Sequence, residues 1–200
     1  MSAIAIDVAF LLPPDARAVT ERVNAHFDTT AVAGFRFDAT HHPHLTLGQH
    51  FVERDRLVDV CTAVATLLSA TRPINLRVTG ARGGRTAQVL AVDPAPMLRR
   101  LHERVMDTLA AYEVAGDAAG FFGDDEPPRD GDVAWVRRFR AESSHARFDP
   151  HITVGIGQTP VDCAPFTFVA GEIAVCHLGR FCTCRDRLAR WALPASPVEQ

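Results

Sequence analysis

The sequence lacks an excess of positive charge. Lys and Arg together number 21 against 24 Asp and Glu, so the net charge is −3 at neutral pH. Duplex nucleic-acid binders carry a basic surface, and the charge of the whole chain gives no such general attraction to polyanions. A small phosphorylated nucleotide or an RNA end remains compatible with this charge. The hydrophobic share of 47% is ample for a buried core.

The sequence also lacks the cysteine pattern of a secreted protein. Its five cysteines form an odd set without a disulfide framework, which favours reduced thiols inside a cell. Residues 1–14 lack the basic region and cleavage site of a signal peptide, and their apolar run is too short to cross a bilayer. We therefore expect a cytoplasmic protein that is not bound to a membrane, and we expect it to be a monomer.

Hydrophobic periodicity predicts strands in both halves of the chain, with helices between them. A loop is expected over 28–43 and another over 117–132, which would act as a lid or as the passage between halves, and a tail is expected around Trp191. Because helices and strands do not alternate strictly, we predict an α+β protein with mainly antiparallel sheets. The expected strands are 3–12, 44–52, 74–79, 86–92, 151–156, 166–170, 172–178 and 181–184, and the expected helices are 17–27, 53–70, 94–112 and 133–142.

A short motif occurs twice. Residues 43–48 read Pro-His-Leu-Thr-Leu-Gly and residues 150–155 read Pro-His-Ile-Thr-Val-Gly, and the copies are 107 residues apart. In a strand, residues two apart share a face. His44 and Thr46 should therefore share one face of the first strand, and His151 and Thr153 one face of the second, while the aliphatic residues are buried on the other.

Two histidines that face each other across a cleft suit phosphodiester chemistry. One neutral imidazole can take a proton from the attacking oxygen while one imidazolium donates a proton to the leaving oxygen. The threonine hydroxyls would bind phosphate oxygens, and neither a nucleophilic side chain nor a metal is required. A single copy of the motif would be weak evidence, and a duplication preserved only for packing is the alternative explanation.

The paired motifs, together with an opening strand that ends at Pro13 and Pro14, resemble the 2H phosphoesterase superfamily, which includes 2'-5' RNA ligases and RNA 2',3'-cyclic phosphodiesterases. The resemblance implies one bilobal domain over residues 1–200, with outer helices and one motif in each of two pseudo-symmetric lobes. It implies that His44 and His151 are the acid/base pair, in an order left open, and that Thr46 and Thr153 bind phosphate. It also implies metal-independent opening of a cyclic phosphate without a cofactor, or ligation in the reverse direction.

Three further residues are candidates for contacts to the substrate. Arg147 and Phe148 precede the second motif and could bind a phosphate and stack on a base, and Phe10 is another possible stacking surface. The single tyrosine, Tyr112, is expected on a helix, so the sequence shows no obvious nucleobase clamp. A catalytically inactive nucleotide or RNA-binding module therefore remains an alternative to an enzyme.

A metal site is a further alternative. His41, His42 and His44 invite a zinc interpretation, but no matching ligand pair with the usual spacing accompanies them. His50 shares a face with His44 by parity and is expected at the surface. Cys182 and Cys184 share one face of an expected strand and follow Cys176, yet buried thiols act more often as small hydrophobic side chains. We predict no metal ligands.

Overall fold

The computed structural model describes residues 2–27, 29, 33–84, 86–123 and 126–194, which form two four-stranded sheets. Sheet A has the order β2-β1-β7-β8 and sheet B the order β5-β4-β3-β6, and every pairing between these strands is antiparallel. Sheet A contains β1 (Ala3–Leu11), β2 (His44–Glu53), β7 (Glu172–Leu178) and β8 (Cys184–Ala192). Sheet B contains β3 (Ile74–Gly83), β4 (Ala87–Val92), β5 (His151–Ile156) and β6 (Phe166–Ala170).

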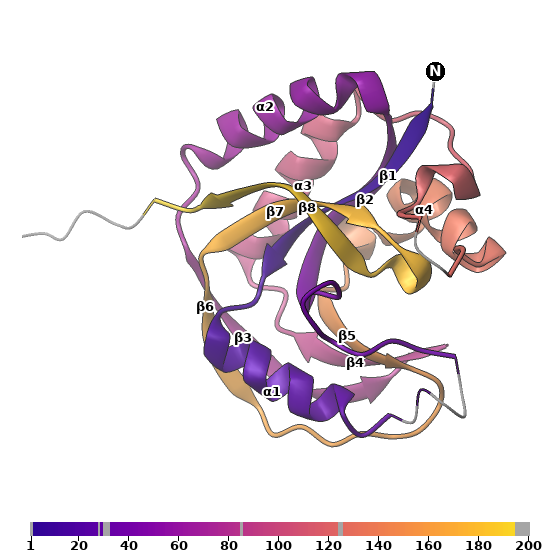
Figure 1. Ribbon diagram of the computed structural model, residues 1–200. Coiled ribbons are helices and arrows are strands. Elements are labelled where there is room, and N and C mark those ends of the chain that lie inside the picture. Colours follow the sequence, from indigo (N-terminus) through magenta and orange to yellow (C-terminus); the bar gives the residue numbers. More distant parts are fainter. Residues whose placement is uncertain (1, 28, 30–32, 85, 124–125, 195–200) are drawn as a thin grey trace, which may run out of the picture.

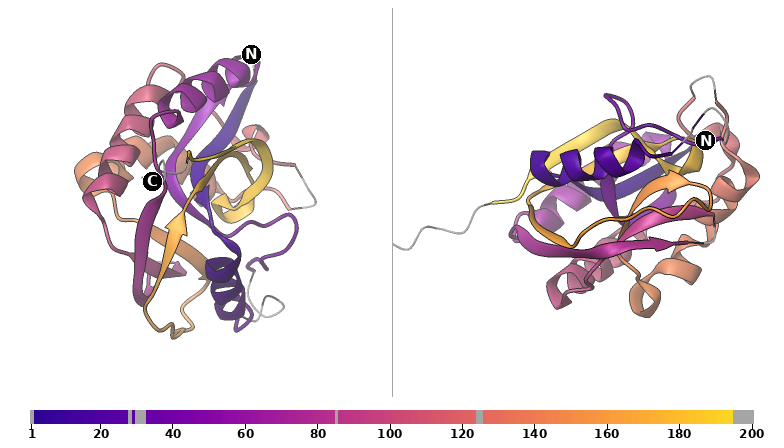
Figure 2. Two further views of the ribbon diagram at one scale, coloured as in Figure 1. Left: turned by 90° about the vertical axis from the view of Figure 1, so that its left-hand side faces the viewer. Right: turned by 90° about the horizontal axis from the view of Figure 1, so that it is seen from below.

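In the described ranges, four α-helices cover the outside of the sheets (Figures 1 and 2). They are α1 (Pro14–Asn24), α2 (Leu57–Leu68), α3 (Pro96–Leu109) and α4 (Asp130–Ser143). Helix α1 follows a strand of sheet A but packs on β5 and β6 of sheet B, whereas α3 and α4 pack against β2 and α2 lies on α3. The predicted α+β class with antiparallel sheets and outer helices is confirmed.

The two sheets share one hydrophobic core, built from one face of each sheet. On β1 the core face carries Ile4, Ile6, Val8 and Phe10, because alternate residues of a strand point to the same side. In both sheets the strand that carries a histidine motif stands at one end of the strand order. Sheet A draws its strands from both ends of the chain, so the two sheets do not correspond to the two halves of the sequence.

A β-bulge interrupts each motif strand at its second aliphatic residue. In sheet A, Val8 pairs with Gly48 and Ala9 pairs with Thr46, so Leu47 has no partner in the register. A bulge adds one residue to one strand and re-aims the side chains that follow it. Residues beyond Leu47 therefore lie on the opposite face from the one that parity predicts.

The second motif repeats this bulge. Gln88 pairs with Gly155 and Val89 pairs with Thr153, which leaves Val154 unpaired. The glycine after the bulge is required by packing, since a Cβ at Gly155 would lie 2.4 Å from the ring of Phe27. The duplication of the sequence is thus matched by a duplication of the backbone geometry.

Residues 180–192 differ most from the prediction. Arg180–Cys182 form a 3₁₀ turn rather than a strand, with positive φ angles of 61° at Phe181 and 54° at Cys182. Such angles are uncommon for residues other than glycine and do not fit a strand. The strand β8 begins only at Cys184 and extends to Ala192, where a tail was expected.

The segment 117–132 is only partly a surface loop. Ala118–Gly120 form a 3₁₀ turn, and Phe121 is 4% exposed and meets the ring of Phe51. Helix α4 begins at Asp130, three residues before the predicted start, while residues 124–125 lie outside the described part. The prediction of a mobile lid is therefore wrong for residues 118–121, because they pack on the neighbouring strand.

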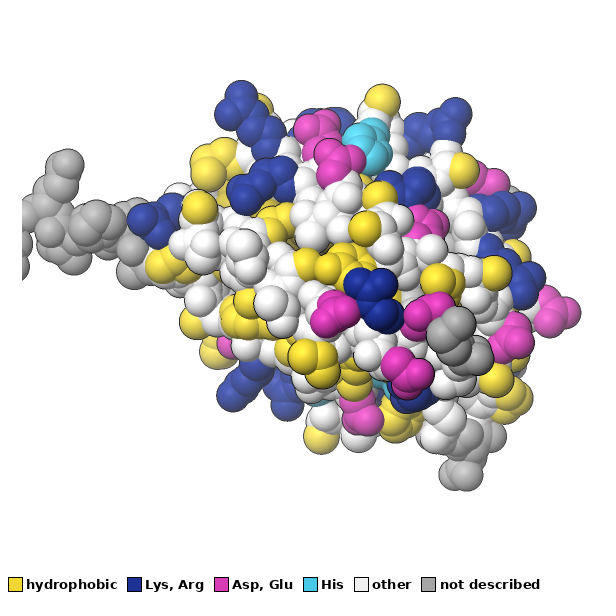
Figure 3. Space-filling view, turned by 90° about the horizontal axis from the view of Figure 1, so that it is seen from above, with side chains coloured by type: hydrophobic (Ala, Val, Ile, Leu, Met, Phe, Trp, Pro, Cys, Tyr) yellow, Lys and Arg dark blue, Asp and Glu magenta, His cyan; other side chains and the backbone are white. Residues whose placement is uncertain are grey.

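Charged side chains of both signs are interspersed on the face shown in Figure 3, which agrees with the small net charge. None of the helices in the described ranges has the length and apolar character needed to cross a bilayer.

Candidate active site

The two motif histidines are held in the same way. The Nδ1 atom of His44 is 2.8 Å from the backbone oxygen of His42, and the Nδ1 atom of His151 is 2.7 Å from the backbone oxygen of Asp149. Because a carbonyl oxygen only accepts, each Nδ1 carries the proton and donates it. The Nε2 atom of each imidazole is therefore the nitrogen available for proton transfer.

Both motifs line one cavity of about 470 Å³, which we call the histidine cavity. His44 and Thr46 contribute from sheet A, and His151 and Thr153 contribute from sheet B. Their aliphatic neighbours Leu45, Leu47, Ile152 and Val154 are fully buried. The predicted facing of both His-x-Thr strands is confirmed by this burial pattern.

A buried carboxyl group that the sequence reasoning missed contacts the first motif. Asp7 is fully buried on β1, and its Oδ2 atom lies 3.5 Å from Nε2 of His44. The same oxygen accepts hydrogen bonds from Thr46 Oγ1 at 2.7 Å and from Gln49 Nε2 at 2.8 Å. Trp135 on α4 extends the network by donating to Gln49 Oε1 at 2.9 Å. An acidic residue inside an apolar strand was the signal in the sequence.

Burial is the largest cause of the pKa shifts of Asp7 and His151. Desolvation raises the pKa of Asp7, against the opposing effects of His44, Gln49 and Thr46. Desolvation also lowers the pKa of His151, with Arg82 and His44 adding to the shift and the carbonyl of Asp149 opposing it. His151 is therefore neutral at neutral pH, and its Nε2 atom is an acceptor.

Aromatic rings surround the histidines, although the sequence showed no clear clamp. Phe37, Trp135 and Phe181 are half-buried and line the histidine cavity together with the buried Phe35. The guanidinium of Arg129 lies 4.2 Å from the centre of the Phe181 ring. These rings come from a loop, a helix and a 3₁₀ turn, so no strand pattern could have indicated them. The nearby pair Phe35 and Phe37 was the only local signal.

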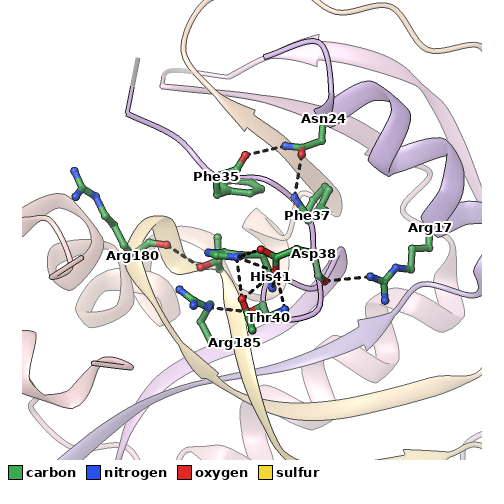
Figure 4. A network of polar contacts seen from close by, with 10 residues as sticks. Arg17, Asn24, Phe35, Phe37, Asp38, Thr40, His41, Arg180 and Arg185 are labelled. Carbon is green, nitrogen blue, oxygen red and sulfur yellow. Dashed lines mark hydrogen bonds and ion pairs between the residues drawn. The ribbon is translucent and has the colours of Figure 1, made fainter. Parts of the chain in front are cut away.

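Asn24 fixes the segment that carries Phe35 and Phe37, which we call the aromatic loop (Figure 4). Its side-chain amide donates to the backbone oxygen of Phe35 at 3.1 Å and accepts from the backbone N–H of Phe37 at 3.0 Å. It also donates to the backbone oxygen of Val154 at 2.9 Å. One buried amide thus joins the aromatic loop to the bulge of the second motif.

The other predicted substrate contacts, Phe10, Arg147 and Phe148, do not line the histidine cavity. Phe10 is fully buried in the core, so the expectation that it stacks on a base is wrong, because no part of its ring reaches solvent. Arg147 and Phe148 line a neighbouring cavity of about 380 Å³, which His151 also lines. The Phe148 ring stacks on His102 at 3.8 Å, and the guanidinium of Arg147 donates to the backbone oxygen of Ala141.

The other histidines near the first motif do not gather around His44. His41 lies beside Asp38, at 3.2 Å between Nδ1 and Oδ1, and His42 lines a separate cavity. His50 is 1% exposed and lies 3.4 Å from a carboxylate oxygen of Glu113, so the prediction of a surface position is wrong. The bulge at Leu47 is the reason, since it turns Gln49 rather than His50 toward the cavity.

Solved structures with low sequence identity share this fold. TT0787 of Thermus thermophilus has a TM-score of 0.61 at 16% identity, over 96% of this chain and 100% of that chain. Escherichia coli LigT gives 0.58 in its complex with 3'-AMP and 0.59 in its complex with NADP+, each at 20% identity over 96% of this chain and 99% of that chain. A comparison with curated protein sequences finds no match.

The sequence profile of the 2'-5' RNA ligase superfamily matches residues 12–167, which is more than half of the chain and includes both motifs. The resemblance inferred from the repeated motif is thereby confirmed. The chain belongs to the 2'-5' RNA ligase superfamily of 2H phosphoesterases.

Proposed function

We propose that the protein is a metal-independent phosphodiesterase that opens a 2',3'-cyclic phosphate, on a nucleoside or at an RNA end, to a 2'-phosphate. The observation that carries this proposal is the pair of identically anchored imidazoles lining one cavity, each on a bulged edge strand. Membership of the 2'-5' RNA ligase superfamily supports an enzyme that acts on phosphoesters.

The reaction needs two proton movements. A water oxygen attacks phosphorus while a base removes its proton, and the bond from phosphorus to the 3'-oxygen breaks as an acid protonates that oxygen. No covalent intermediate is required, because positioned groups on both sides of the phosphate handle both protons. General acid/base help from each imidazole contributes roughly 10²–10⁴-fold to the rate.

The geometry supports a role for each histidine. His151 is the base, since burial lowers its pKa and leaves Nε2 as an acceptor at neutral pH. His44 is then the acid, because the reaction needs a second group to protonate the leaving oxygen and the other motif imidazole lines the same cavity, with its Nε2 atom 3.5 Å from the carboxyl of Asp7. The hydroxyl proton of Thr46 is donated to Asp7 in this structure, so Thr46 must turn before it can donate to a phosphate oxygen. Thr153 faces the same cavity as the second phosphate ligand.

The lining of the histidine cavity supports a nucleotide rather than a bare phosphate. Half-buried aromatic rings at Phe37, Trp135 and Phe181 offer faces on which a base can stack. The LigT structures with 3'-AMP and NADP+ show that a protein of this fold binds nucleotides. The volume of about 470 Å³ falls within the usual range for small-molecule sites.

The test is hydrolysis of 2',3'-cyclic AMP in excess EDTA, followed by ³¹P NMR to identify the product. We expect the wild type to release the 2'-phosphate, and the variants His44→Ala and His151→Ala to lose at least about 100-fold in kcat. His26→Ala is the matched control, because His26 is exposed and does not line the histidine cavity. Turnover abolished by EDTA would contradict the metal-independent reaction. Nucleotide binding without turnover would instead indicate a binding module.

A further inference from the structure

Three potential metal ligands from three strands converge beside the first motif. A carboxylate oxygen of Asp7, a ring nitrogen of His44 and the thiol sulfur of Cys184 all lie within 4.8 Å of one another. The nitrogen is Nε2, because Nδ1 is bonded to the backbone of His42 and Nε2 lies 3.5 Å from Asp7. Among the residues that the structure describes, this is the one such group of three or more His, Cys, Asp or Glu side chains.

The backbone brings Cys184 to this place. Strand β8 stands at the far end of sheet A from β2, yet its first residue pairs with the residue that precedes the motif. The backbone N–H of His42 donates to the oxygen of Cys184 at 3.0 Å, which joins the two ends of the sheet at this level. The positive-φ turn at Phe181 and Cys182 immediately precedes this contact. The contact joins two segments that are far apart in the sequence, so no local pattern around Cys184 indicates it.

The spacing of the Asp7 oxygen and the His44 nitrogen suits a small ion with tetrahedral coordination, and the Cys184 sulfur lies within 4.8 Å of both atoms. Nitrogen, oxygen and sulfur ligands at about 2.0–2.3 Å from such an ion lie roughly 3.3–3.8 Å apart, and the Asp7 to His44 separation of 3.5 Å already falls in this range. Imidazole and thiolate select zinc and similar ions over magnesium and calcium. Three protein ligands leave a fourth position for water or another oxygen, as in open zinc sites.

Two of the three ligands are held before any ion arrives. The Oδ2 atom of Asp7 is fixed by Thr46 and Gln49, and the ring of His44 is fixed by its bond to the backbone. The other carboxyl oxygen, Oδ1, is buried and has no hydrogen-bond partner. A buried polar atom without a partner costs about 1–3 kcal/mol, and a bound cation would satisfy it. His44, Cys182 and Thr183 line the histidine cavity, so this cavity is the route of entry.

We propose that Asp7, His44 and Cys184 form a binding site for a zinc-class divalent ion, and that an ion bound there blocks the phosphodiesterase reaction. The ion would coordinate the Nε2 atom that has to deliver the proton to the leaving oxygen, and the proton on this Nε2 atom and the thiol proton of Cys184 would both leave to solvent on binding. The site itself stands on geometry alone, whereas the block rests on the proposed function.

Cobalt(II) is the probe for the site, because a thiolate ligand gives a charge-transfer band that other side chains do not give. We titrate the full chain, without an affinity tag, with CoCl₂ and then with ZnCl₂. The wild type should develop the thiolate band and the intense visible bands of four-coordinate cobalt, and zinc should abolish both. Cys184→Ala should lack the thiolate band. Cys163→Ala, which alters a buried thiol outside the site, should keep it.

Two further measurements guard against a folding defect. Zinc should raise the Tm of the wild type and of Cys163→Ala, because a ligand that binds the folded protein stabilises the folded protein. It should not raise the Tm of Cys184→Ala, which lacks one of the ligands. His44→Ala changes a side chain that lines the cavity and is 12% exposed, and this variant should bind cobalt at least about tenfold more weakly. A missing thiolate band in the wild type, or a band that survives in Cys184→Ala, would overturn the site.

The block is tested separately with 2',3'-cyclic AMP. Zinc should inhibit the wild type and EDTA should restore its activity, whereas Cys184→Ala should turn over at the wild-type rate and resist zinc. Wild-type hydrolysis that is unaffected by zinc at concentrations saturating the cobalt site would overturn the block. A clear thiolate band in a protein that hydrolyses no cyclic phosphate would overturn the proposed phosphodiesterase and leave the metal site standing.

Discussion

A buried histidine, His102 on α3, connects the two motifs and makes stability depend on pH. Its Nδ1 atom donates to the backbone oxygen of Leu47, the bulge residue of the first motif, at 2.7 Å. Its Nε2 atom accepts from the backbone N–H of His145 at 2.9 Å, and its ring stacks on Phe148, three residues before the second motif histidine. One ring nitrogen thus donates and the other accepts, which is the arrangement of a neutral imidazole. Protonation of Nε2 would remove the acceptor for the N–H of His145.

The size of the effect follows from the pKa of His102, which burial lowers from 6.5 to about 4. Below pH 6.5 the unfolded chain binds a proton at this position that the folded protein does not, so stability falls as the pH decreases from 6.5 toward 4. The predicted loss from this one group is about 2 kcal/mol at pH 5 and about 3 kcal/mol once the pH is below the folded pKa.

Urea unfolding at pH 7 and at pH 5 measures this loss. His102→Gln keeps a donor and an acceptor but does not titrate, so the fall in unfolding free energy between the two pH values should be about 2 kcal/mol smaller than in the wild type. His26→Gln replaces an exposed histidine and should keep the wild-type fall. An equal fall in His102→Gln and in the wild type would refute the assignment of a neutral, depressed His102.

Three further substitutions test the supports of the site. Gly155→Ala places a Cβ 2.4 Å from the ring of Phe27 and should lower the unfolding free energy by about 1–3 kcal/mol in urea; an unchanged value would show that the ring moves freely. Asn24→Ala leaves buried backbone groups unpaired, so it should lower that free energy by about 1–3 kcal/mol and raise KM for a cyclic nucleotide; an unchanged KM would separate the aromatic loop from binding. Trp135→Phe removes the hydrogen bond to Gln49 and should lower kcat/KM roughly fivefold, about 1 kcal/mol; full activity would make that bond dispensable.

The sequence predicted the facing of the motif residues because a strand has a period of two, and burial of Leu45 and Ile152 maintains that register. The same rule failed at His50, since the bulge at Leu47 shifts the parity of every residue after it. A bulge depends on how the partner strand pairs, and no local pattern in residues 43–53 indicates that partner.

The missed parts of the site depend on contacts between distant segments. Asp7 meets His44 only because β1 pairs with β2, and Cys184 meets both only because β8 returns to the residue before the motif. The strand β8 itself was missed because the turn at Phe181 adopts a left-handed backbone that the residue type does not indicate. Periodicity identifies helices, strands and their buried faces. Contacts between distant residues depend instead on the order of the strands in a sheet.

The most direct test of the central claim compares single and double substitutions of the two motif histidines. If His44 and His151 act as one acid/base unit on one phosphate, each single alanine variant should lose nearly as much kcat for 2',3'-cyclic AMP in EDTA as the double variant loses. Losses that add in full, or a single variant that keeps wild-type turnover, would show that the two imidazoles do not act together on the same bond.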